Sequence, residues 1–433
     1  MISPAPIDAI IRRRRYFSSA LKTSYQTPLN IVRGAGAYLY DAQGREYLDC
    51  VNNVAHVGHC QAQVVEAMRR QVGQINTNTR YLDENRLVYA ERLLAKFPKP
   101  LDVLFLVCSG SEANDLALRL IHAYTRRRGI VVVEGAYHGH LCSTLELSPY
   151  KYDGPGGAGG SEHVFAVPMP DTYRGRHRHP EPSLGMTYAG YVERGIEVLA
   201  QKSHAVAGMF CESLLSCGGQ IVLPAGYLQA AFSSVRQAGG LCVADEVQVG
   251  FGRVGSHFWG FEGQGVVPDI VTLGKPIGNG YPMAAVVTTR EIASAFENGM
   301  EYFNTFGGNS VACATGLAVL DVLERDRLQQ HAHTVGAQLL ISLRELQKRF
   351  FCIGDVRGMG LFLGIELVAD NDARTPAPDL AHTVVEYLCQ HGVLMSADGP
   401  MGNVLKFKPP MVFSTADAER FVSTLERALR QVS

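Results

Sequence analysis

Between residues 61 and 310, short apolar runs alternate with longer stretches in which apolar residues recur every three or four positions. The short runs predict buried strands, and the longer stretches, such as 84–97 and 112–127, predict amphipathic helices. The strands are expected at residues 103–108, 130–134, 205–211, 241–244 and 270–273. Strands interleaved with helices favour an α/β domain with a mainly parallel sheet.

The two ends of the chain carry different patterns. The first part begins with a predicted helix, and residues 37–41 and 46–50 flank a glycine turn, which predicts a hairpin. After residue 309, a long helical stretch leads to strands near 360–367 and 404–407 and to a terminal helix from Ala416. We expect three parts: an N-terminal segment (1–60) that packs with a small domain, a large domain (61–310), and a small C-terminal α+β domain (311–433).

Composition narrows the class of protein. The 433 residues are 46% hydrophobic and 19% charged, as in globular proteins, and a net charge of −1 gives no general attraction to nucleic acid or membrane. No apolar stretch approaches the ~20 residues of a membrane span, and no secretion signal is visible. Ten cysteines without a CxxC pair indicate reduced thiols in a cytoplasmic protein. His56 and His59 lack a third ligand nearby, so we expect loop hydrogen bonds and no metal site.

Two of the apolar runs end in a residue suited to chemistry. The run at residues 243–248 contains Asp245, and the run at residues 269–276 contains Lys275, which lies between a glycine and a proline. A lysine can form a Schiff base with the aldehyde of pyridoxal phosphate, and a carboxylate can pair with its protonated pyridine nitrogen. In isolation, Asp245 could equally cap a turn and Lys275 could be an exposed lysine at a strand end. The hypothesis of a pyridoxal-phosphate site therefore depends on the neighbouring motifs.

Further strand ends suit the same cofactor. Ser109, Gly110 and Ser111 precede a predicted helix, where free amides and hydroxyls can bind a phosphate, although an ordinary serine N-cap is the alternative. Tyr137 follows another strand and is placed to stack on a flat ring. Residues 250–255 match the dinucleotide fingerprint, but no helix pattern follows and no acidic residue ends the next strand. A dinucleotide site is therefore not expected.

These motifs, in this order over nearly the whole chain, resemble the class III (ω-type) aminotransferases, which are pyridoxal-phosphate enzymes of fold type I. The resemblance implies a mainly parallel seven-stranded sheet flanked by helices, together with a smaller α+β domain. It also implies a Schiff base at Lys275, and a homodimer in which Thr305 reaches the cofactor phosphate of the neighbouring subunit. It assigns the phosphate to Gly110 and Ser111, the ring faces to Tyr137 and His138, the pyridine nitrogen to Asp245, the ring hydroxyl to Gln248, and a place near the active site to Glu212.

Within the class, segments such as 52–59, 148–151 and 396–400 are most similar to ethanolamine-phosphate and 5-phosphohydroxylysine phospho-lyases. Many members that bind an α-carboxylate have an arginine where this chain has Lys406. Arginine can bind a carboxylate through two parallel hydrogen bonds, and lysine cannot. The resemblance implies elimination of phosphate from a phosphorylated primary amine, with O-phosphoethanolamine giving acetaldehyde, ammonia and phosphate. Candidates for binding the substrate phosphate are Arg80, Lys151, Arg174 and Lys406.

Two other functions stay open at this point. An ω-aminotransferase that transfers an amino group to pyruvate or another keto acid would use the same cofactor residues. A cofactor-binding protein without catalysis is disfavoured because Lys275 and Asp245 are both present. Lys408 is interpreted either as a second phosphate-binding lysine next to Lys406 or as a surface lysine.

Overall fold

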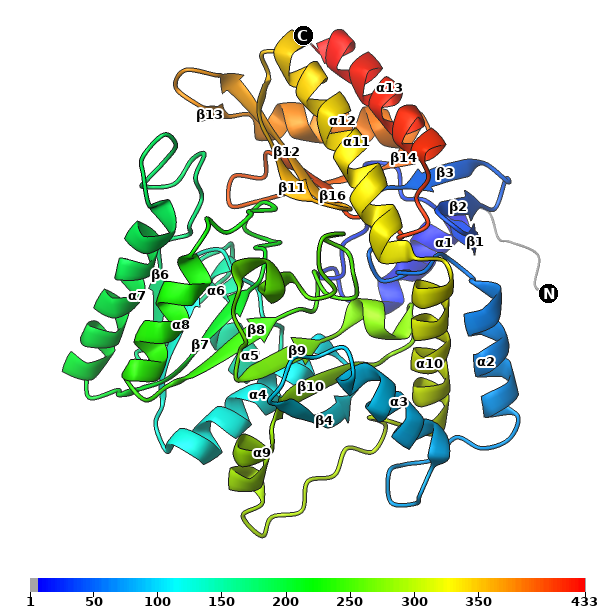
Figure 1. Ribbon diagram of the computed structural model, residues 1–433. Coiled ribbons are helices and arrows are strands. Elements are labelled where there is room, and N and C mark those ends of the chain that lie inside the picture. The colour runs from blue at the N-terminus through cyan, green and yellow to red at the C-terminus, as the bar shows by residue number, and fades with distance from the viewer. Residues whose placement is uncertain (1–6, 433) are drawn as a thin grey trace.

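The computed structural model describes residues 7–432, and its largest element is a seven-stranded sheet (Figure 1). Strands β9, β8, β7, β5 and β6 run parallel, whereas β10 is antiparallel to both of its neighbours. The prediction of a mainly parallel sheet is confirmed. In spatial order the strands are β4 (Leu101–Val107), β10 (Ala284–Thr289), β9 (Ile270–Leu273), β8 (Leu241–Asp245), β7 (Val206–Glu212), β5 (Gly129–Val133) and β6 (Val164–Val167).

Helices cover both faces of this sheet. Alternate residues of β5 enter different cores: Val131 and Val133 pack with α7 (Leu184–Gln201) and α8 (Tyr227–Gln237), whereas Ile130 and Val132 pack with α4 (Gly110–Thr125). Figure 1 shows α7 and α8 side by side on one side of the sheet and α4 on the other. Because both faces are buried, five of the seven strands read as continuous apolar runs and were located from the sequence, whereas β6 and β10 were not predicted.

The remaining helices of this part either pack beside the sheet or lie in its loops. Helix α10 packs against α2 and α3 beside the sheet. The longer helices are α2 (Ala62–Val72), α3 (Glu84–Leu94), α9 (Arg290–Phe296) and α10 (Ser310–Arg325). The short loop helices are α5 (Cys142–Glu146), α6 (Pro149–Tyr152), η2 (Gly260–Gln264) and η3 (Lys275–Gly278).

A second sheet is formed by the C-terminal part of the chain, in the order β11-β12-β16-β15, with β13 paired to β12. Lys406 of β16 lies opposite Gly364 of β12 and Ser396 of β15. The strands are β11 (Ile353–Met359), β12 (Phe362–Asp370), β13 (Thr375–Pro376), β15 (Ser396–Asp398) and β16 (Val404–Phe407). The accompanying helices are α11 (Leu328–Arg349), α12 (Pro378–Gln390) and α13 (Thr415–Val432).

The N-terminal hairpin is joined to the C-terminal part by strand pairing. Strand β3 pairs in parallel with β14, so the hairpin becomes part of a sheet that residues from both ends of the chain share. The predicted hairpin is confirmed, and of the predicted first helix residues 1–6 lie outside the described residues. The elements are α1 (Ile7–Arg13), η1 (Arg14–Tyr16), β1 (Ile31–Ala35), β2 (Tyr38–Asp41), β3 (Glu46–Asp49) and β14 (Val393–Leu394). The three proposed domain boundaries stay predictions.

Two further expectations can be compared with the structure. Within residues 7–432, no helix has the length and apolar character needed to cross a membrane. The expected loop hydrogen bonds of the two histidines are confirmed: His56 Nε2 lies 2.8 Å from the carbonyl oxygen of Phe251, and His59 Nε2 lies 2.6 Å from Asp49 Oδ2.

Candidate active site

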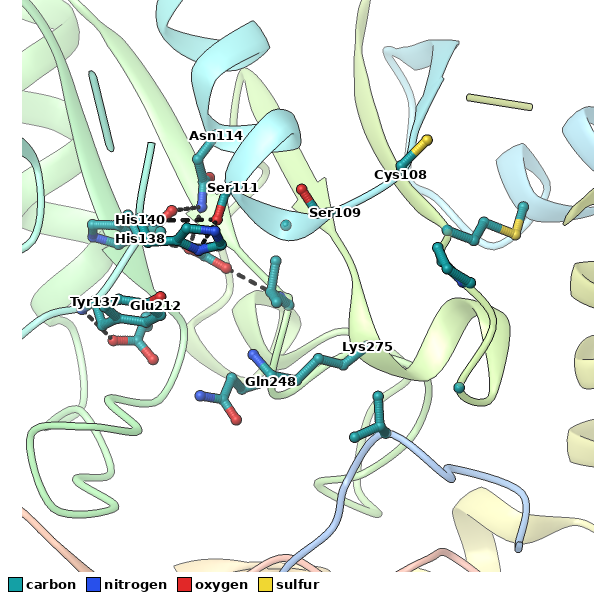
Figure 2. Close-up of a pocket in the computed structure, with 18 of the residues that line it drawn as sticks. Cys108, Ser109, Ser111, Asn114, Tyr137, His138, His140, Glu212, Gln248 and Lys275 are labelled. Atoms are coloured by element: carbon teal, nitrogen blue, oxygen red, sulfur yellow. Dashed lines mark hydrogen bonds and ion pairs between the residues drawn. The ribbon is translucent and has the colours of Figure 1, made fainter. Parts of the chain in front are cut away.

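A cavity of about 310 Å³ opens where the parallel strands of the large sheet end (Figure 2). Glu212 ends β7 and Asp245 ends β8, and the two residues are register partners on adjacent strands. Lys275 follows β9 after one intervening residue. Because parallel strands present their carboxyl ends at one sheet edge, residues far apart in the sequence converge there. The structure thus brings Asp245 and Lys275 together in one cavity.

The carboxylate of Asp245 is buried and held by three donors. Asn114 Nδ2 and His138 Nδ1 each lie 2.8 Å from Oδ2, and the backbone N–H of Val247 donates to Oδ1 at 3.1 Å. These three hydrogen bonds fix the orientation of the carboxylate. His138, which the resemblance assigned to a ring face, therefore has a contact that the sequence did not reveal. The arrangement provides a fixed anion at the back of the cavity.

Lys275 carries its amine into a nearly dry environment. Burial lowers the pKa of its side chain, and the nearby carboxylate of Asp245 opposes that shift in part. The backbone at Lys275 has a φ of +32°, a region that residues with a β-carbon rarely adopt. A lysine amine with a lowered pKa is a better nucleophile and base near neutral pH than an exposed one.

The first turn of α4 forms a cradle suited to a phosphate. The backbone N–H groups of Gly110 and Ser111 have no hydrogen-bond partner among residues 7–432, as expected for the start of a helix. A β-carbon at position 110 would lie 3.0 Å from Val247 Cγ1, tighter than an ordinary contact, so glycine suits this close approach. The Ser111 hydroxyl interacts with His140 Nδ1 at 3.2 Å. Ser109 caps the helix by accepting from Glu112 N, so the serine N-cap alternative also holds for that residue.

Tyr137 and Glu212 form another wall of the cavity. The backbone N–H groups of Tyr137 and Ser216 donate to the Glu212 carboxylate at 3.3 and 3.0 Å. Burial, with the neighbouring charge of Asp245, raises the pKa of Glu212 to about 7. Figure 2 shows the Tyr137 ring beside this carboxylate. Tyr137 lines the cavity, where a flat ring could lie against it.

Gln248 and Lys408 are linked by a hydrogen bond beside this cavity. Lys408 Nζ donates to Gln248 Oε1 at 3.0 Å and also to the hydroxyl of Ser216, and Asn53 Nδ2 donates to the same Gln248 oxygen at 2.9 Å. Lys408 is 1% exposed, so the interpretation of Lys408 as a surface lysine is wrong. The sequence did not reveal its burial, because the two prolines after it obscure the strand pattern.

The candidates for phosphate binding lie in different places. Lys406 is close enough to Lys275 to lower the amine's pKa, and its Nζ pairs with Asp398 at 3.0 Å. Lys151 Nζ lies 5.9 Å from the centre of the Tyr137 ring, just outside the cavity. Within one chain the other candidates are not brought to the cavity: Arg80 pairs with Glu301, Arg174 pairs with Glu366, and Thr305 is exposed and away from the lining.

Three polar residues of the site were not predicted: Asn114, His140 and Asn53. Asn114 could have been predicted, because it follows Ser111 by three residues and therefore lies on the same helix face. The contacts of Asn53 and His140 depend on loops that meet only in the folded chain. Within residues 7–432, no cluster of three or more histidine, cysteine, aspartate or glutamate side chains could hold a metal ion.

The donor set fits pyridoxal phosphate. It provides a cavity-lining amine of lowered pKa for the aldehyde, a fixed carboxylate for the ring nitrogen and unpaired amides at a helix start for the phosphate. The His138 Nε2 atom is buried without a partner among the described residues, so the polar lining is incomplete in the chain alone. This fold and this site define a pyridoxal-phosphate enzyme of fold type I.

Comparisons with known proteins agree, and the chain belongs to the class-III aminotransferase family. The family model described as aminotransferase class-III matches residues 20–429. The chain is 50% identical to "Alanine–glyoxylate aminotransferase 2-like" of Drosophila melanogaster, covering 98% of this chain and 87% of the relative. It is 41% identical to "Ethanolamine-phosphate phospho-lyase homolog 1" of Caenorhabditis elegans, covering 96% and 92%. A phospholyase from Arthrobacter, solved in complex with phosphoethanolamine, has a TM-score of 0.94 and 39% identity, covering 98% and 100%. The predictions of family, fold type and cofactor are confirmed.

Proposed function

We propose that this enzyme is a carbon–oxygen lyase that eliminates phosphate from a phosphorylated primary amine. The leading substrate is O-phosphoethanolamine, which with one molecule of water would give acetaldehyde, ammonia and phosphate. The observation that carries the proposal is Lys406, which lies near Lys275 and stands where many members that bind an α-carboxylate have an arginine. The similarity to the Arthrobacter phospholyase, whose structure contains phosphoethanolamine, supports this choice.

We assign the cofactor contacts to the residues that line the cavity. Lys275 holds the aldehyde carbon, Asp245 the ring nitrogen, and Gly110 with Ser111 the phosphate, while Tyr137 covers a ring face. His138 and Glu212 complete the contacts through the hydrogen bonds described above, and Gln248 meets the ring hydroxyl. When bound, pyridoxal phosphate supplies an electron sink for a carbanion next to the amine nitrogen.

Lys275 is proposed as the base. Burial lowers its pKa, so a larger share of the amine is unprotonated at neutral pH and can take a proton from the carbon next to the substrate nitrogen. The proton then resides on Lys275 Nζ. Asp245, held in place by Asn114 and His138, would pair with the protonated ring nitrogen of the bound cofactor.

Departure of phosphate from the adjacent carbon requires cations that stabilise the leaving group. Lys406 is the first choice because it lies near Lys275, and Lys151 is the second because it lies beside Tyr137. Arg174 is a weaker candidate, since Glu366 already holds its guanidinium. Arg80 lies over the Phe303 ring at 4.4 Å, on the surface that also carries Thr305.

We propose that this surface is the interface of a homodimer that shares its active sites. It exposes large apolar side chains on the segments next to Arg80 and Thr305, which is unusual for a surface that faces water only. Those side chains are Tyr81 (68% exposed), Leu82 (98%), Met300 (71%) and Phe306 (69%). Across such an interface Thr305 would reach the partner's cofactor phosphate. A cytoplasmic location is proposed from the reduced thiols.

The rival function is an ω-aminotransferase, and the name of the Drosophila relative favours it. The two functions differ in whether a keto acid is needed, because a lyase regenerates its cofactor within each cycle. The test is to incubate the cofactor-loaded enzyme with O-phosphoethanolamine alone and to measure inorganic phosphate and acetaldehyde, with Lys275→Ala as control. We expect equal amounts of both products from the natural enzyme and none from the control. Turnover only when pyruvate is added would establish the aminotransferase instead.

A further inference from the structure

The two ends of the Gln248 side-chain amide differ in hydrogen bonding. Its oxygen accepts hydrogen bonds from Asn53 Nδ2 at 2.9 Å and from Lys408 Nζ at 3.0 Å. Its NH2 group makes no hydrogen bond within residues 7–432, and the side chain lines the cofactor cavity. Figure 2 shows it next to the amine of Lys275. The two ends of the amide therefore face different surroundings.

The chemistry of Lys408 fixes which end faces which way. An ammonium group has three N–H donors and no acceptor, and a neutral amine still has two N–H donors. Lys408 thus donates to both Ser216 Oγ and Gln248 Oε1 in either protonation state. Rotating the Gln248 amide by half a turn would set its NH2 group against the N–H groups of Lys408, and the Asn53 amide would have to turn as well. Asn53 and Lys408 are only 6% and 1% exposed, so water could not replace the hydrogen bonds that both would lose.

The backbone holds these two donors firmly in place. The backbone N–H of Lys408 donates to the carbonyl oxygen of Cys50 at 2.8 Å, which ties the end of β16 to the segment that carries Asn53. The next carbonyl, that of Pro409, accepts from the buried guanidinium of Arg253 at 2.8 Å. The amine and the amide therefore approach Gln248 from segments that are fixed to each other.

We propose that Asn53 and Lys408 are positioning residues that orient Gln248, so that its NH2 group, and not its oxygen, faces the ring hydroxyl of bound pyridoxal phosphate. This inference rests on the proposed contact between Gln248 and the ring hydroxyl. A donor at that place stabilises the negatively charged form of the hydroxyl oxygen. The protonated Schiff base at Lys275 then loses its proton more easily.

The test is a pH titration of the Schiff-base absorbance of the purified, cofactor-loaded enzyme, without substrate. Asn53→Ala removes one donor and changes no charge, so the pKa of the Schiff base should rise by about 0.5 to 1, as for the loss of one hydrogen bond. Lys408→Met removes the other donor to Gln248 Oε1 and should also raise it. Lys406→Met is the matched control, because Lys406 is also near Lys275 and pairs with Asp398 instead of Gln248.

The outcomes distinguish an effect of Gln248 orientation from an effect of lysine charge. An unchanged titration in Asn53→Ala would overturn the inference, and equal shifts in Lys408→Met and Lys406→Met would show that Lys408 acts through charge alone. If Lys408→Met does not fold, the neutral Asn53→Ala change still tests whether Gln248 is oriented by its neighbours. Absence of any Schiff-base band in the natural enzyme would instead refute the assignment of Lys275. Phosphate release plays no part in this readout, so a failure of the proposed reaction would be recognised separately.

Discussion

Replacement of Asn114 by leucine tests whether Asp245 is held for cofactor binding. Asn114 is 1% exposed, and its Nδ2 donates to Asp245 Oδ2 and to the carbonyl oxygen of His138, both at 2.8 Å. Leucine fills a similar volume and removes both hydrogen bonds. The carboxylate then keeps the donors His138 and Val247, but it is less firmly oriented and its charge is less well stabilised.

The magnitude follows from the two lost hydrogen bonds. A hydrogen bond to a charged group contributes about 1.5 to 3 kcal/mol, and a neutral one about 1 kcal/mol. Partial recovery through the apolar contacts of leucine leaves a net loss of about 1 to 3 kcal/mol in the free energy of unfolding. For the cofactor, weaker pairing of Asp245 with the ring nitrogen should raise the dissociation constant about tenfold, which corresponds to ~1.4 kcal/mol.

The assay follows urea unfolding of the cofactor-free protein through its single tryptophan, Trp259, which is buried and stacked on Phe97. Cofactor affinity is measured separately by absorbance. The matched control is Asn403→Leu, because Asn403 is equally buried and its Nδ2 donates to a carboxylate and a carbonyl, those of Glu366 and Leu367. We expect similar losses of stability in both variants, but weaker cofactor binding only in Asn114→Leu. Unchanged cofactor affinity in that variant would refute the reasoning.

Three further predictions concern charge and specificity. Burial and Asp245 raise the pKa of Glu212 to about 7, so the folded protein binds that proton more tightly than the unfolded chain, and this group's contribution to stability falls as the pH rises from about 4.5 to 7. Glu212→Gln should therefore gain stability relative to the natural protein between pH 5.5 and pH 8 in urea titrations, and parallel curves would contradict this. Lys406→Arg introduces a guanidinium that can bind a carboxylate through two hydrogen bonds. The ratio of pyruvate-dependent alanine formation to phosphate release should therefore rise several-fold. An unchanged ratio would show that residue 406 does not determine which reaction occurs. Thr305→Ala should weaken cofactor binding about fivefold, as expected for one lost hydrogen bond of ~1 kcal/mol, and unaltered affinity would argue against a contribution across the dimer.

Five strands of the large sheet and the two central residues could be predicted because their signals are local, whereas β6 and β10 were missed. Strand β9 begins and ends where the apolar run predicted, and β8 extends only one residue further, to Asp245. These strands are buried on both faces, so their runs stand out from their surroundings. Placing Asp245 and Lys275 in one cavity then required only the rule that parallel strands end at the same edge of a sheet.

The supporting contacts could not be predicted because they join segments far apart in the chain. Asn53 meets Gln248 across 195 positions, and Lys408 meets Ser216 across 192. No periodicity or spacing in the sequence encodes such an approach, since it depends on how the two sheets pack. The same reason explains Arg174, which looked available for a phosphate but pairs with Glu366 of the second sheet.

The state of the cofactor during turnover tests the proposed lyase reaction most directly. The loaded enzyme is mixed with excess O-phosphoethanolamine and no keto acid, and phosphate is counted per active site while the cofactor absorbance is followed. The proposed lyase predicts many phosphates per site and a cofactor that ends in its aldehyde form, bound to Lys275. Conversion of the cofactor to its amine form, with no phosphate beyond one per site, would contradict the central claim and identify an aminotransferase.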